Sequence, residues 1–249
     1  MKYIRRLLKR RTEQAAAEFD PVSRFQSDHY VRHNARRLEH LASLGIPVAG
    51  SRVLEIGAGI GDHTHYYLDR GCEVVATDAR PENLSILRSR YPSCRVEELN
   101  VDSGDVWLGG ERFDVVHCYG LLYHVREPQA VLRRAADANS NLLFLETCVS
   151  FGREEAVNSV SEPAEDPTQA FGGLGCRPTR PWIFSRLREL YEHVYMPRTQ
   201  PNHFEFPVDW ERPNDHSAAF QRAIFVASRR PLLNPALSDA LLDVQSRHA

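Results

Sequence analysis

The chain has 249 residues, of which 42% are hydrophobic, and this composition is ordinary for a globular protein with a sizeable core. Its longest apolar runs, such as residues 142–145, have the length of a strand, so the sequence predicts no membrane span. The net charge is −2, but residues 1–11 carry six basic side chains and no acidic one, which leaves the remainder acidic. Nucleic-acid binding normally requires a basic surface, so the acidic body disfavours such a partner and only the basic segment supports one.

The N-terminal segment and the cysteines indicate in which cellular compartment we expect the protein. Residues 1–11 lack the apolar core of a secretion signal, and their helical spacing of apolar residues predicts a surface helix. None of the five cysteines forms a CxxC pair, so we expect a cytoplasmic protein without a disulfide framework or a metal cluster. His29 and His33 have the i,i+4 spacing of one helix face, but without a third ligand they predict no metal site.

Helical periodicity spans residues 25–44 and stops at Gly45, which predicts one helix in an N-terminal extension, residues 1–50, that caps the rest. From residue 51 onward, short apolar strands alternate with helices of about ten residues, a pattern typical of a parallel sheet with helices on both faces. The expected strands are 52–56, 73–77, 94–99, 113–118 and 141–147, and the expected helices are 62–70, 81–90 and 127–138.

The pattern changes at residue 150, and ten of the fifteen prolines lie beyond residue 160. Residues 150–181 show neither helical nor strand periodicity, so we interpret them as a lid inserted into a single α/β domain that spans residues 51–230. A helix over 181–190 and two strands, 192–199 and 221–228, are expected after the lid. Residues 231–249 are expected to form a tail with a short helix over 235–244.

A glycine-rich stretch, VLEIGAGIGDHT, follows the first strand at residues 53–64. Gly57, Gly59 and Gly61 form GxGxG, whereas the dinucleotide fingerprint requires GxGxxG and this chain has Asp62 at the last position. A bound pyrophosphate also favours basic neighbours, and no lysine or arginine lies between Val53 and Asp69. An NAD-dependent oxidoreductase is therefore the less favoured alternative.

Acidic residues surround the glycines instead. Glu55 precedes the loop and Asp62 follows it, while Asp78 and Asp102 end the next two expected strands, at the sheet edge where ligands of such folds bind. These acids suit a ligand with an ammonium group, a sulfonium and sugar hydroxyls, a description that S-adenosylmethionine fits. Asp62 could equally cap the following helix, because Asp is a favoured N-cap residue.

The stretches VLEIGAGIGDHT, TDARPEN, LNVDS and FDVVHCYGLLYHVREP resemble, in order and spacing, the motifs of class I S-adenosylmethionine-dependent methyltransferases. The resemblance implies a Rossmann-like, mostly parallel seven-stranded sheet whose last strand is antiparallel, and S-adenosyl-L-methionine as cofactor with S-adenosyl-L-homocysteine as product. It implies that Asp78 binds the ribose, that Asp102 faces the adenine and that Glu55 neighbours the methionine end. The cofactor residues carried over are Glu55, Gly57, Ala58, Gly59, Gly61, Asp78, Ala79, Asp102, Tyr119 and Gly120.

The segment YGLLYHVREP is expected to stand over the reacting end of the cofactor. His124 is the candidate base, because its ordinary pKa near 6.5 suits proton removal around neutrality, although it could merely pack behind the cofactor. We therefore expect O-methylation of a small-molecule or glycan-related acceptor. GLLYHVREP also looks like the corresponding part of tRNA wobble-uridine carboxymethyltransferases, which keeps an RNA-modifying enzyme as an alternative.

The C-terminal third should determine the acceptor, because it mixes polar and aromatic side chains in a way that suits a hydroxyl-rich ligand. Two arginines of the lid could instead meet a carboxylate or a phosphate on the acceptor. Tyr30 could cover the cofactor if the N-terminal helix folds over the site. The candidate acceptor residues are Tyr123, Glu146, Arg177, Arg180, Gln200, Asn202 and His203.

Overall fold

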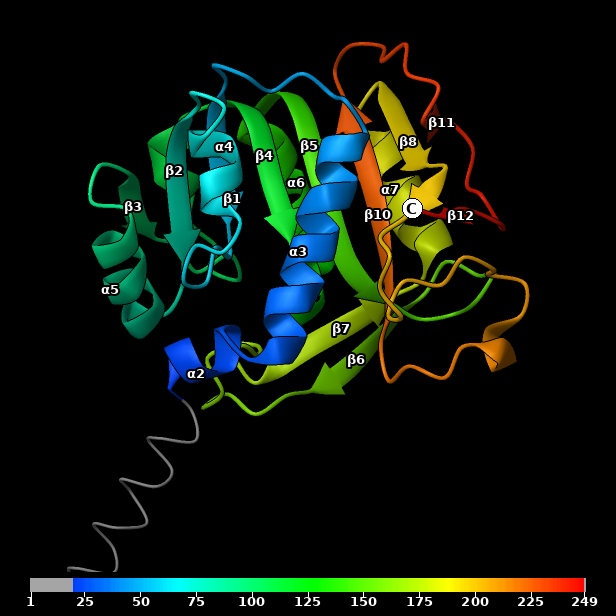
Figure 1. Cartoon of the computed structure of the whole chain (residues 1–249), viewed down its shortest axis with the longest axis horizontal. Helices are drawn as coiled ribbons and strands as arrows, with labels where there is room; N and C mark the ends of the chain where they lie inside the picture. The colour runs from blue at the N-terminus through cyan, green and yellow to red at the C-terminus, as the bar shows by residue number, and fades with distance from the viewer. Residues whose placement is uncertain (1–19, 249) are drawn as a thin grey trace, which may run out of the picture.

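The computed structural model describes residues 20–248, so the predicted surface helix over residues 1–11 lies outside the described part. Its main element is an eight-stranded sheet (Figure 1). In spatial order the strands are β11 (Leu237–Ser238), β8 (His193–Pro197), β10 (Gln221–Ser228), β5 (Asn139–Val149), β4 (Phe113–Tyr119), β1 (Arg52–Ile56), β2 (Glu73–Asp78) and β3 (Arg95–Glu98).

The strand directions confirm the predicted Rossmann-like arrangement. All neighbouring pairs from β3 through β2, β1 and β4 to β5 are parallel, whereas β10 runs antiparallel to β5 and to β8. The two-residue β11 pairs with β8 and adds an edge beyond the seven expected strands. Residues 142–145 in the middle of β5 are all buried, as expected for a strand that is covered on both faces.

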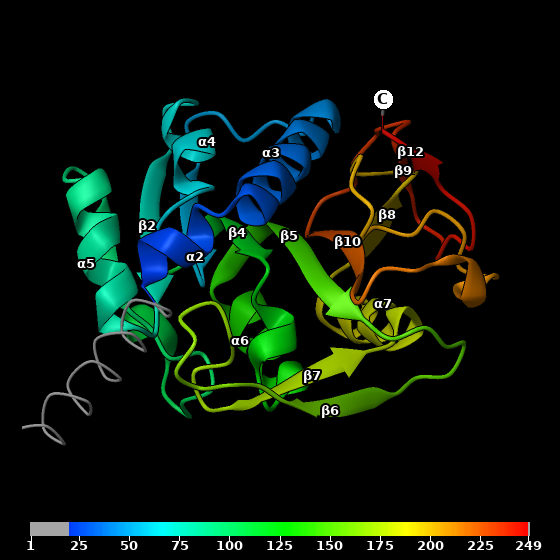
Figure 2. The same cartoon turned by 60° about the horizontal axis from the view of Figure 1, so that its bottom comes forward.

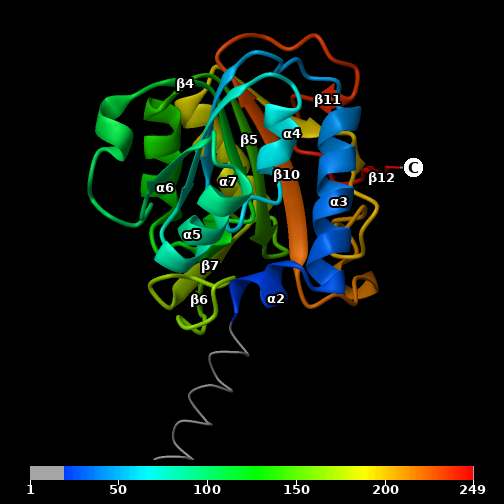
Figure 3. The same cartoon turned by 60° about the vertical axis from the view of Figure 1, so that its left-hand side comes forward.

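Helices cover both faces of the sheet. α3 (Asp28–Ser43), α4 (Thr64–Leu68) and α5 (Pro81–Arg90) contribute to one hydrophobic core, and α6 (Pro128–Asp137) and α7 (Arg180–Leu190) contribute to the other. Figure 3 shows the sheet between α6 on one side and α3 on the other. α6 begins at a proline in its first turn and buries Val131, Leu132, Ala135 and Ala136, which are spaced three to four residues apart on one face.

The N-terminal helix is divided in two. α2 (Pro21–Phe25) begins at Asp20, whose carboxylate accepts a hydrogen bond from the Ser23 N–H at 2.8 Å, and the longer α3 follows after a short turn. Figures 1 and 2 show α2 and the ribbon of β6 and β7 at the edge of the sheet toward which β4 and β5 point. No described helix is both long and apolar enough to traverse a bilayer.

The lid expected to be irregular contains an antiparallel ribbon, β6 (Val157–Ser161) paired with β7 (Leu174–Pro178). Four of the five β6 residues are exposed, so the ribbon buries no face that would have imposed an alternating pattern on the sequence. The loop between the two strands, residues 162–173, folds back toward the glycine loop.

The helix predicted for residues 235–244 is wrong. Leu237 is 5% exposed and lies in β11, which pairs with β8, and β12 (Ser246–Arg247) pairs with β9 (Thr199–Gln200). The Arg198 N–H donates to the Ala236 carbonyl at 2.8 Å, and the Gln245 side chain donates to the Pro197 carbonyl at 2.6 Å. These tertiary hydrogen bonds hold the tail extended against its local helical preference.

Candidate functional site

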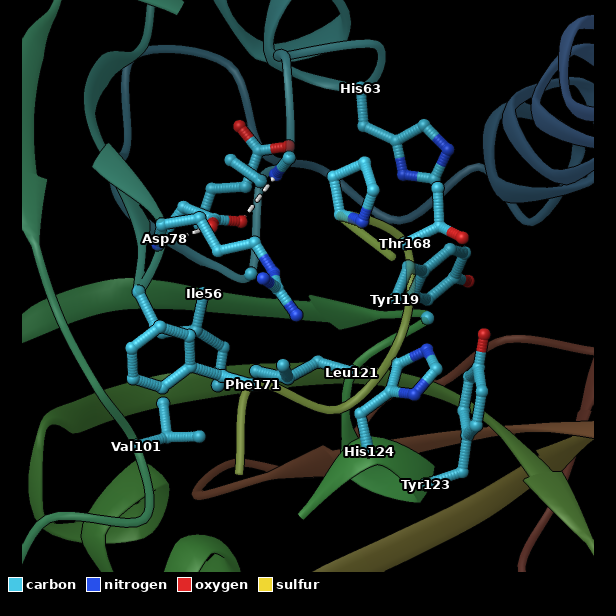
Figure 4. Close-up of a pocket in the computed structure, with 18 of the residues that line it drawn as sticks. Ile56, His63, Asp78, Val101, Tyr119, Leu121, Tyr123, His124, Thr168 and Phe171 are labelled. Carbon is cyan, nitrogen blue, oxygen red and sulfur yellow. Dashed lines mark hydrogen bonds between the residues drawn. The ribbon is translucent and has the colours of Figure 1, made fainter. Parts of the chain in front are cut away.

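A cavity of about 1060 Å³, counting space open to solvent, lies at the carboxyl ends of β1, β2 and β4 (Figure 4). Its wall combines the glycine loop, the ends of these strands, α2 and α3, and the lid loop. Ligands of open α/β sheets bind at this edge, beyond the carboxyl ends of the strands, so the cavity is the candidate site for a cofactor and an acceptor.

The glycine loop forms one part of the wall. Gly57 and Gly59 have φ of 69° and 57°, a left-handed conformation that favours glycine, and a Cβ on Gly59 would lie 2.8 Å from the Phe25 ring. The Gly59 N–H donates to Asp78 Oδ2 at 2.9 Å, which ties the loop to the end of β2. Gly61 is different: it is not in the wall, and a Cβ there would lie 2.4 Å from Leu87 of α5, so it serves packing.

Two buried carboxylates face the cavity. Asp78 is 9% exposed and accepts hydrogen bonds from the Arg80 N–H at 2.9 Å and from Asn83 at 3.1 Å, yet burial raises its pKa to about 6. Glu55 is 2% exposed and accepts from Thr64 at 2.6 Å, and burial raises its pKa to about 7. Neither carboxylate forms an ion pair among residues 20–248, so a ligand that offers an ammonium or hydroxyl groups would stabilise the charged forms.

The remaining residues predicted for the cofactor, Ala58, Ala79, Asp102, Tyr119 and Gly120, also lie in the wall. Asp102 accepts the Arg126 N–H at 3.1 Å. The Tyr119 hydroxyl is buried and has no hydrogen-bond partner within the described chain, so a bound molecule could supply one. A Cβ on Gly120, which has φ of 78°, would lie 3.1 Å from Arg37 Nη1, so glycine admits that guanidinium to the wall.

An apolar slot lies between the sheet edge and the lid. Ile56, Val101 and Leu121 line it together with Phe171 of the lid loop, and Figure 4 shows these four side chains at the same end of the cavity as Asp78. A flat aromatic ring such as adenine fits this environment. The sequence offered no signal for Phe171, because it lies in the segment without periodicity.

Asp62 lies in the wall and does not cap α4. That helix begins at Thr64 with His63 as its N-cap residue, so the capping interpretation is wrong. The Asp62 carboxylate accepts hydrogen bonds from Gln26 at 2.9 Å and from Arg90 at 2.7 Å. The fold therefore brings an arginine from α5 to a loop that has no basic residue in its own sequence.

His124 stands in the wall at the end of the short turn that follows β4. Its Nδ1 lies 2.5 Å from Glu162 Oε2, and Glu162 also accepts from the Ala170 N–H at 2.8 Å and from Arg177 at 3.0 Å. Burial lowers the pKa of His124 although the Glu162 carboxylate acts in the opposite direction. An ionised carboxylate only accepts hydrogen bonds, so Nδ1 carries the proton and Nε2 has a free lone pair.

The sequence did not identify Glu162, which lies in the irregular lid. Burial tends to raise the pKa of its carboxyl, but the hydrogen bond with His124 and the donors around it hold that pKa below the ordinary value. Arg177, a predicted acceptor residue, is not part of the cavity wall. It donates to Glu162 and also to the Tyr123 carbonyl at 3.1 Å, so its guanidinium holds Glu162 in place.

A buried charge network completes the wall near Tyr123. Arg37 donates to Glu146 at 2.7 Å, and Arg222 donates to Glu146 at 3.1 Å, to Glu205 at 2.7 Å and to the Tyr123 hydroxyl at 3.3 Å. Both arginines line the cavity, whereas Glu146, a predicted acceptor residue, is fully buried behind them. Two positive and two negative charges balance, so this part of the wall is polar without a net charge.

Two further histidines of the wall, His63 and His117, lie in the quoted motifs but were not among the predicted site residues. His117 Nδ1 lies 2.9 Å from Tyr67 Oη, and His117 Nε2 lies 3.1 Å from His63 Nδ1. His63 Nε2 lies 3.2 Å from Asn34 Oδ1. Burial lowers the pKa of His117 to about 3 and that of His63 well below its ordinary value. Both rings are therefore neutral at physiological pH and link β4 to α3 by hydrogen bonds.

The last predicted acceptor residues lie outside the cavity wall. Arg180 donates to the Leu242 carbonyl at 2.6 Å and covers the Trp210 ring, and Gln200 donates to Gln245 at 3.0 Å in the interior. Asn202 is exposed, and His203 stacks on His33 with ring centroids 4.8 Å apart. By contrast, Tyr123, the remaining candidate acceptor residue, and Tyr30, suggested to cover the cofactor, both lie in the wall.

Comparison with known proteins places this cavity in context. Residues 54–140 match a family described as a methyltransferase domain. The ubiquinone biosynthesis O-methyltransferase of Bordetella avium is 30% identical over 131 residues, which cover 49% of this chain and 51% of that protein. Its counterpart in Cereibacter sphaeroides is 33% identical over 123 residues, with 49% and 42% covered. The chain thus spans about half the length of these curated relatives.

Solved structures extend the similarity to most of the fold. The N-terminal domain of EvdMO1 with SAH bound is 25% identical, with a TM-score of 0.60 over 82% of this chain and 85% of that one. The same domain is known in the presence of SAH and D-fucose. Magnesium protoporphyrin IX methyltransferase from Synechocystis PCC 6803, with bound SAM, is 16% identical, with a TM-score of 0.56 over 86% and 91% of the two chains, and shares the fold.

Proposed function

We propose that the chain carries a class I S-adenosylmethionine-dependent methyltransferase domain and methylates a hydroxyl of a neutral, sugar-like acceptor with His124 as the base. The observation that carries this proposal is the hydrogen bond between His124 and Glu162 on the cavity wall. It leaves the Nε2 lone pair of a neutral imidazole available for a proton.

The cavity fits the cofactor in three respects. Asp78 would hold the ribose hydroxyls, Glu55 would pair with the ammonium of the methionine end, and the slot that contains Phe171 would take the adenine. The close backbone at Gly59 and the unpartnered Tyr119 hydroxyl support a ligand at this position. These features do not require a pyrophosphate, so the NAD-dependent alternative gains no support from them.

S-adenosylmethionine supplies the electrophilic methyl carbon when it is bound. The wall of Tyr123, His124, Arg37 and Arg222 would orient an acceptor hydroxyl opposite that carbon, and closure of the lid loop excludes water. His124 Nε2 would accept the proton of the acceptor hydroxyl, and the Glu162 carboxylate would stabilise the resulting imidazolium.

The acceptor class follows from the charge of the wall. Arg37 and Arg222 are each paired with a buried glutamate, so they offer hydrogen bonds to a neutral ligand more readily than a net positive site for a phosphate. Asn34 and Tyr123 add further polar atoms to the wall. The D-fucose named with the EvdMO1 domain supports the same class, and the names of the curated relatives support O-methylation of a small molecule.

Calorimetry and methyl transfer test the proposal together. Wild type and His124→Ala should both bind S-adenosylhomocysteine, whereas transfer of labelled methyl to D-fucose should fall about 10²- to 10⁴-fold in the variant. His65→Ala, a change at an exposed histidine of α4, serves as the control and should keep full activity.

Each result that contradicts the proposal points to a different part of it. Absence of S-adenosylmethionine binding would exclude the cofactor, and unchanged turnover of His124→Ala would exclude the base. Transfer to a phenol but to no sugar would exclude the acceptor class. Transfer to tRNA that falls steeply with salt would favour the RNA-modifying alternative.

A further inference from the structure

Three ligand-type side chains converge beside the charge network and outside the cavity wall. His29 and His33 project from the same face of α3, and Glu205 reaches them from the loop before β10. His29 Nε2 lies 3.5 Å from Glu205 Oε1, and His33 Nε2 lies 3.8 Å from Glu205 Oε2. The ligand atoms of the three residues all lie within 4.8 Å of one another. The third ligand that the sequence did not reveal is thus supplied by the fold.

The imidazole of His33 gives an independent indication. The residue is fully buried, and neither ring nitrogen has a hydrogen-bond partner in the part of the chain that the structure describes. Its contacts with Glu205 and with the stacked His203 ring are too long or wrongly oriented for a hydrogen bond. Leaving buried polar atoms without a partner is unfavourable, and a bound ion would satisfy one of the two His33 nitrogens.

We propose that His29, His33 and Glu205 form a binding site for a divalent transition-metal ion of the Zn²⁺ type. Two imidazoles and a carboxylate are a donor set that Zn²⁺ accepts. Ligand atoms about 2.0–2.2 Å from a tetrahedral ion lie roughly 3.3 Å apart, so the observed separations require only small movements.

The surroundings permit an ion at this position. Glu205 also pairs with Arg222, but the network of Arg37, Arg222, Glu146 and Glu205 has no net charge, so the ion meets no uncompensated cation. The His29 side chain is 43% exposed, which leaves a route for the ion and a water molecule for the fourth position.

The ion would tie α3 to the loop that contains Glu205. The same helix supplies Tyr30, Asn34 and Arg37 to the cavity wall, so the ion would fix the cap relative to the sheet. Because binding of this kind stabilises the folded state, the melting temperature should rise with ion concentration, independently of any methyl transfer.

The full chain, freed of metals by a chelator, is titrated with Zn²⁺ and, as a spectroscopic probe, with Co²⁺. We expect one ion per chain and the visible absorption of four-coordinate Co²⁺. His29→Ala should weaken binding at least about 100-fold, since even outer-shell partners cost 10–100-fold. The matched control His65→Ala, at an exposed position of α4, should bind as tightly as wild type.

His29→Ala is the primary variant. The His29 side chain is partly exposed, so its removal should disturb folding little. His33→Phe is the second variant, since an aromatic ring preserves packing against Phe206 and His203 while it removes the ligand. Loss of stoichiometric binding in either variant supports the site. An apo wild type that takes up no ion, or equal affinities of His29→Ala and His65→Ala, would overturn it.

Discussion

Glu162 and His124, 38 residues apart in sequence, are joined by a hydrogen bond between a carboxylate of the lid and the ring of the candidate base. Because the pair is buried, the carboxylate fixes which nitrogen carries the proton and which one faces a reactant. Two further donors, the Ala170 N–H and Arg177, hold the carboxylate in turn.

Glu162→Gln removes the charge that stabilises an imidazolium on His124, so we expect kcat to fall about 10- to 100-fold with little change in cofactor affinity. The Glu162 carboxylate raises the pKa of His124. Without it, the acid limb of the kcat–pH profile should move to lower pH, because the base loses its proton earlier. Glu165→Gln, a change at an exposed glutamate of the same loop, should shift neither quantity.

Cofactor affinity should depend on the protonation of Glu55, whose pKa is about 7. A protonated carboxyl cannot pair with an ammonium, so calorimetry between pH 5.5 and 7 should show affinity rising with pH, by at most about tenfold per unit. Glu55→Gln should bind more weakly and lose this dependence. Glu73→Gln, at a position 70% exposed, should retain it.

The same carboxyl also affects the stability of the ligand-free protein. Its folded-state pKa is raised above the ordinary value of 4.5, so its stabilising contribution is present below about pH 4.5 and is lost as pH rises through about 7. We expect Glu55→Gln, without ligand at pH 8, to melt at a higher temperature than wild type. Its free energy of unfolding should increase by at most about 3 kcal/mol. A lower melting temperature for the variant would contradict the conclusion that burial of the charged Glu55 carboxylate destabilises the folded protein.

Gly59→Ala should reduce both stability and cofactor affinity. An alanine at φ of 57° costs about 1–2 kcal/mol, and its Cβ would also meet the Phe25 ring of α2. Gly71→Ala is a matched control, because Gly71 has φ of 68° but no atom within 4 Å of the added Cβ. Urea unfolding should show a loss for both variants and a larger one for Gly59→Ala because of the Phe25 contact, whereas calorimetry should show weaker cofactor binding only for Gly59→Ala.

Arg80 anchors the lid loop from β2's carboxyl end. Its guanidinium donates to the carbonyls of Ala164 at 2.9 Å and of Gln169 at 3.2 Å. Arg80→Ala should speed hydrogen exchange in residues 162–173 and weaken cofactor binding about tenfold. Arg88→Ala removes a comparable bond from α5 to the Val96 carbonyl, away from the lid, and should leave both measurements unchanged.

The sequence predicted the sheet, and it predicted that the glycine loop and Asp78 lie close together, because both depend on local patterns. Strand and helix periodicities determine the order of elements, and the glycine loop and Asp78 lie at the ends of adjacent parallel strands. The tail between residues 231 and 248 shows the opposite case, since strand pairing with β8 and β9 outweighs the helical pattern.

The acceptor side could not be predicted in the same way. Arg37 and Arg222 reach the wall from a helix and a late strand, and Glu162 of the lid loop holds His124 of the same wall, so only the tertiary fold brings these residues together. Arg222 does have a local signal in the sequence, because it is a charged residue near the start of a mostly apolar strand. Gln200 and Arg180 were predicted to contact the acceptor because they are polar residues in the C-terminal third. In the structure they form hydrogen bonds inside the protein, as buried polar side chains generally do.

The lid loop contacts the adenosine side through Arg80 and Asn83 and supplies the partner of His124 through Glu162. A chain with this loop swung away would hold its base without an orienting carboxylate. In the proposed reaction, exchange of the spent cofactor and removal of the acceptor proton would therefore belong to two different states of this segment. Turnover would alternate between them, and the enzyme would be chemically inactive whenever it is open.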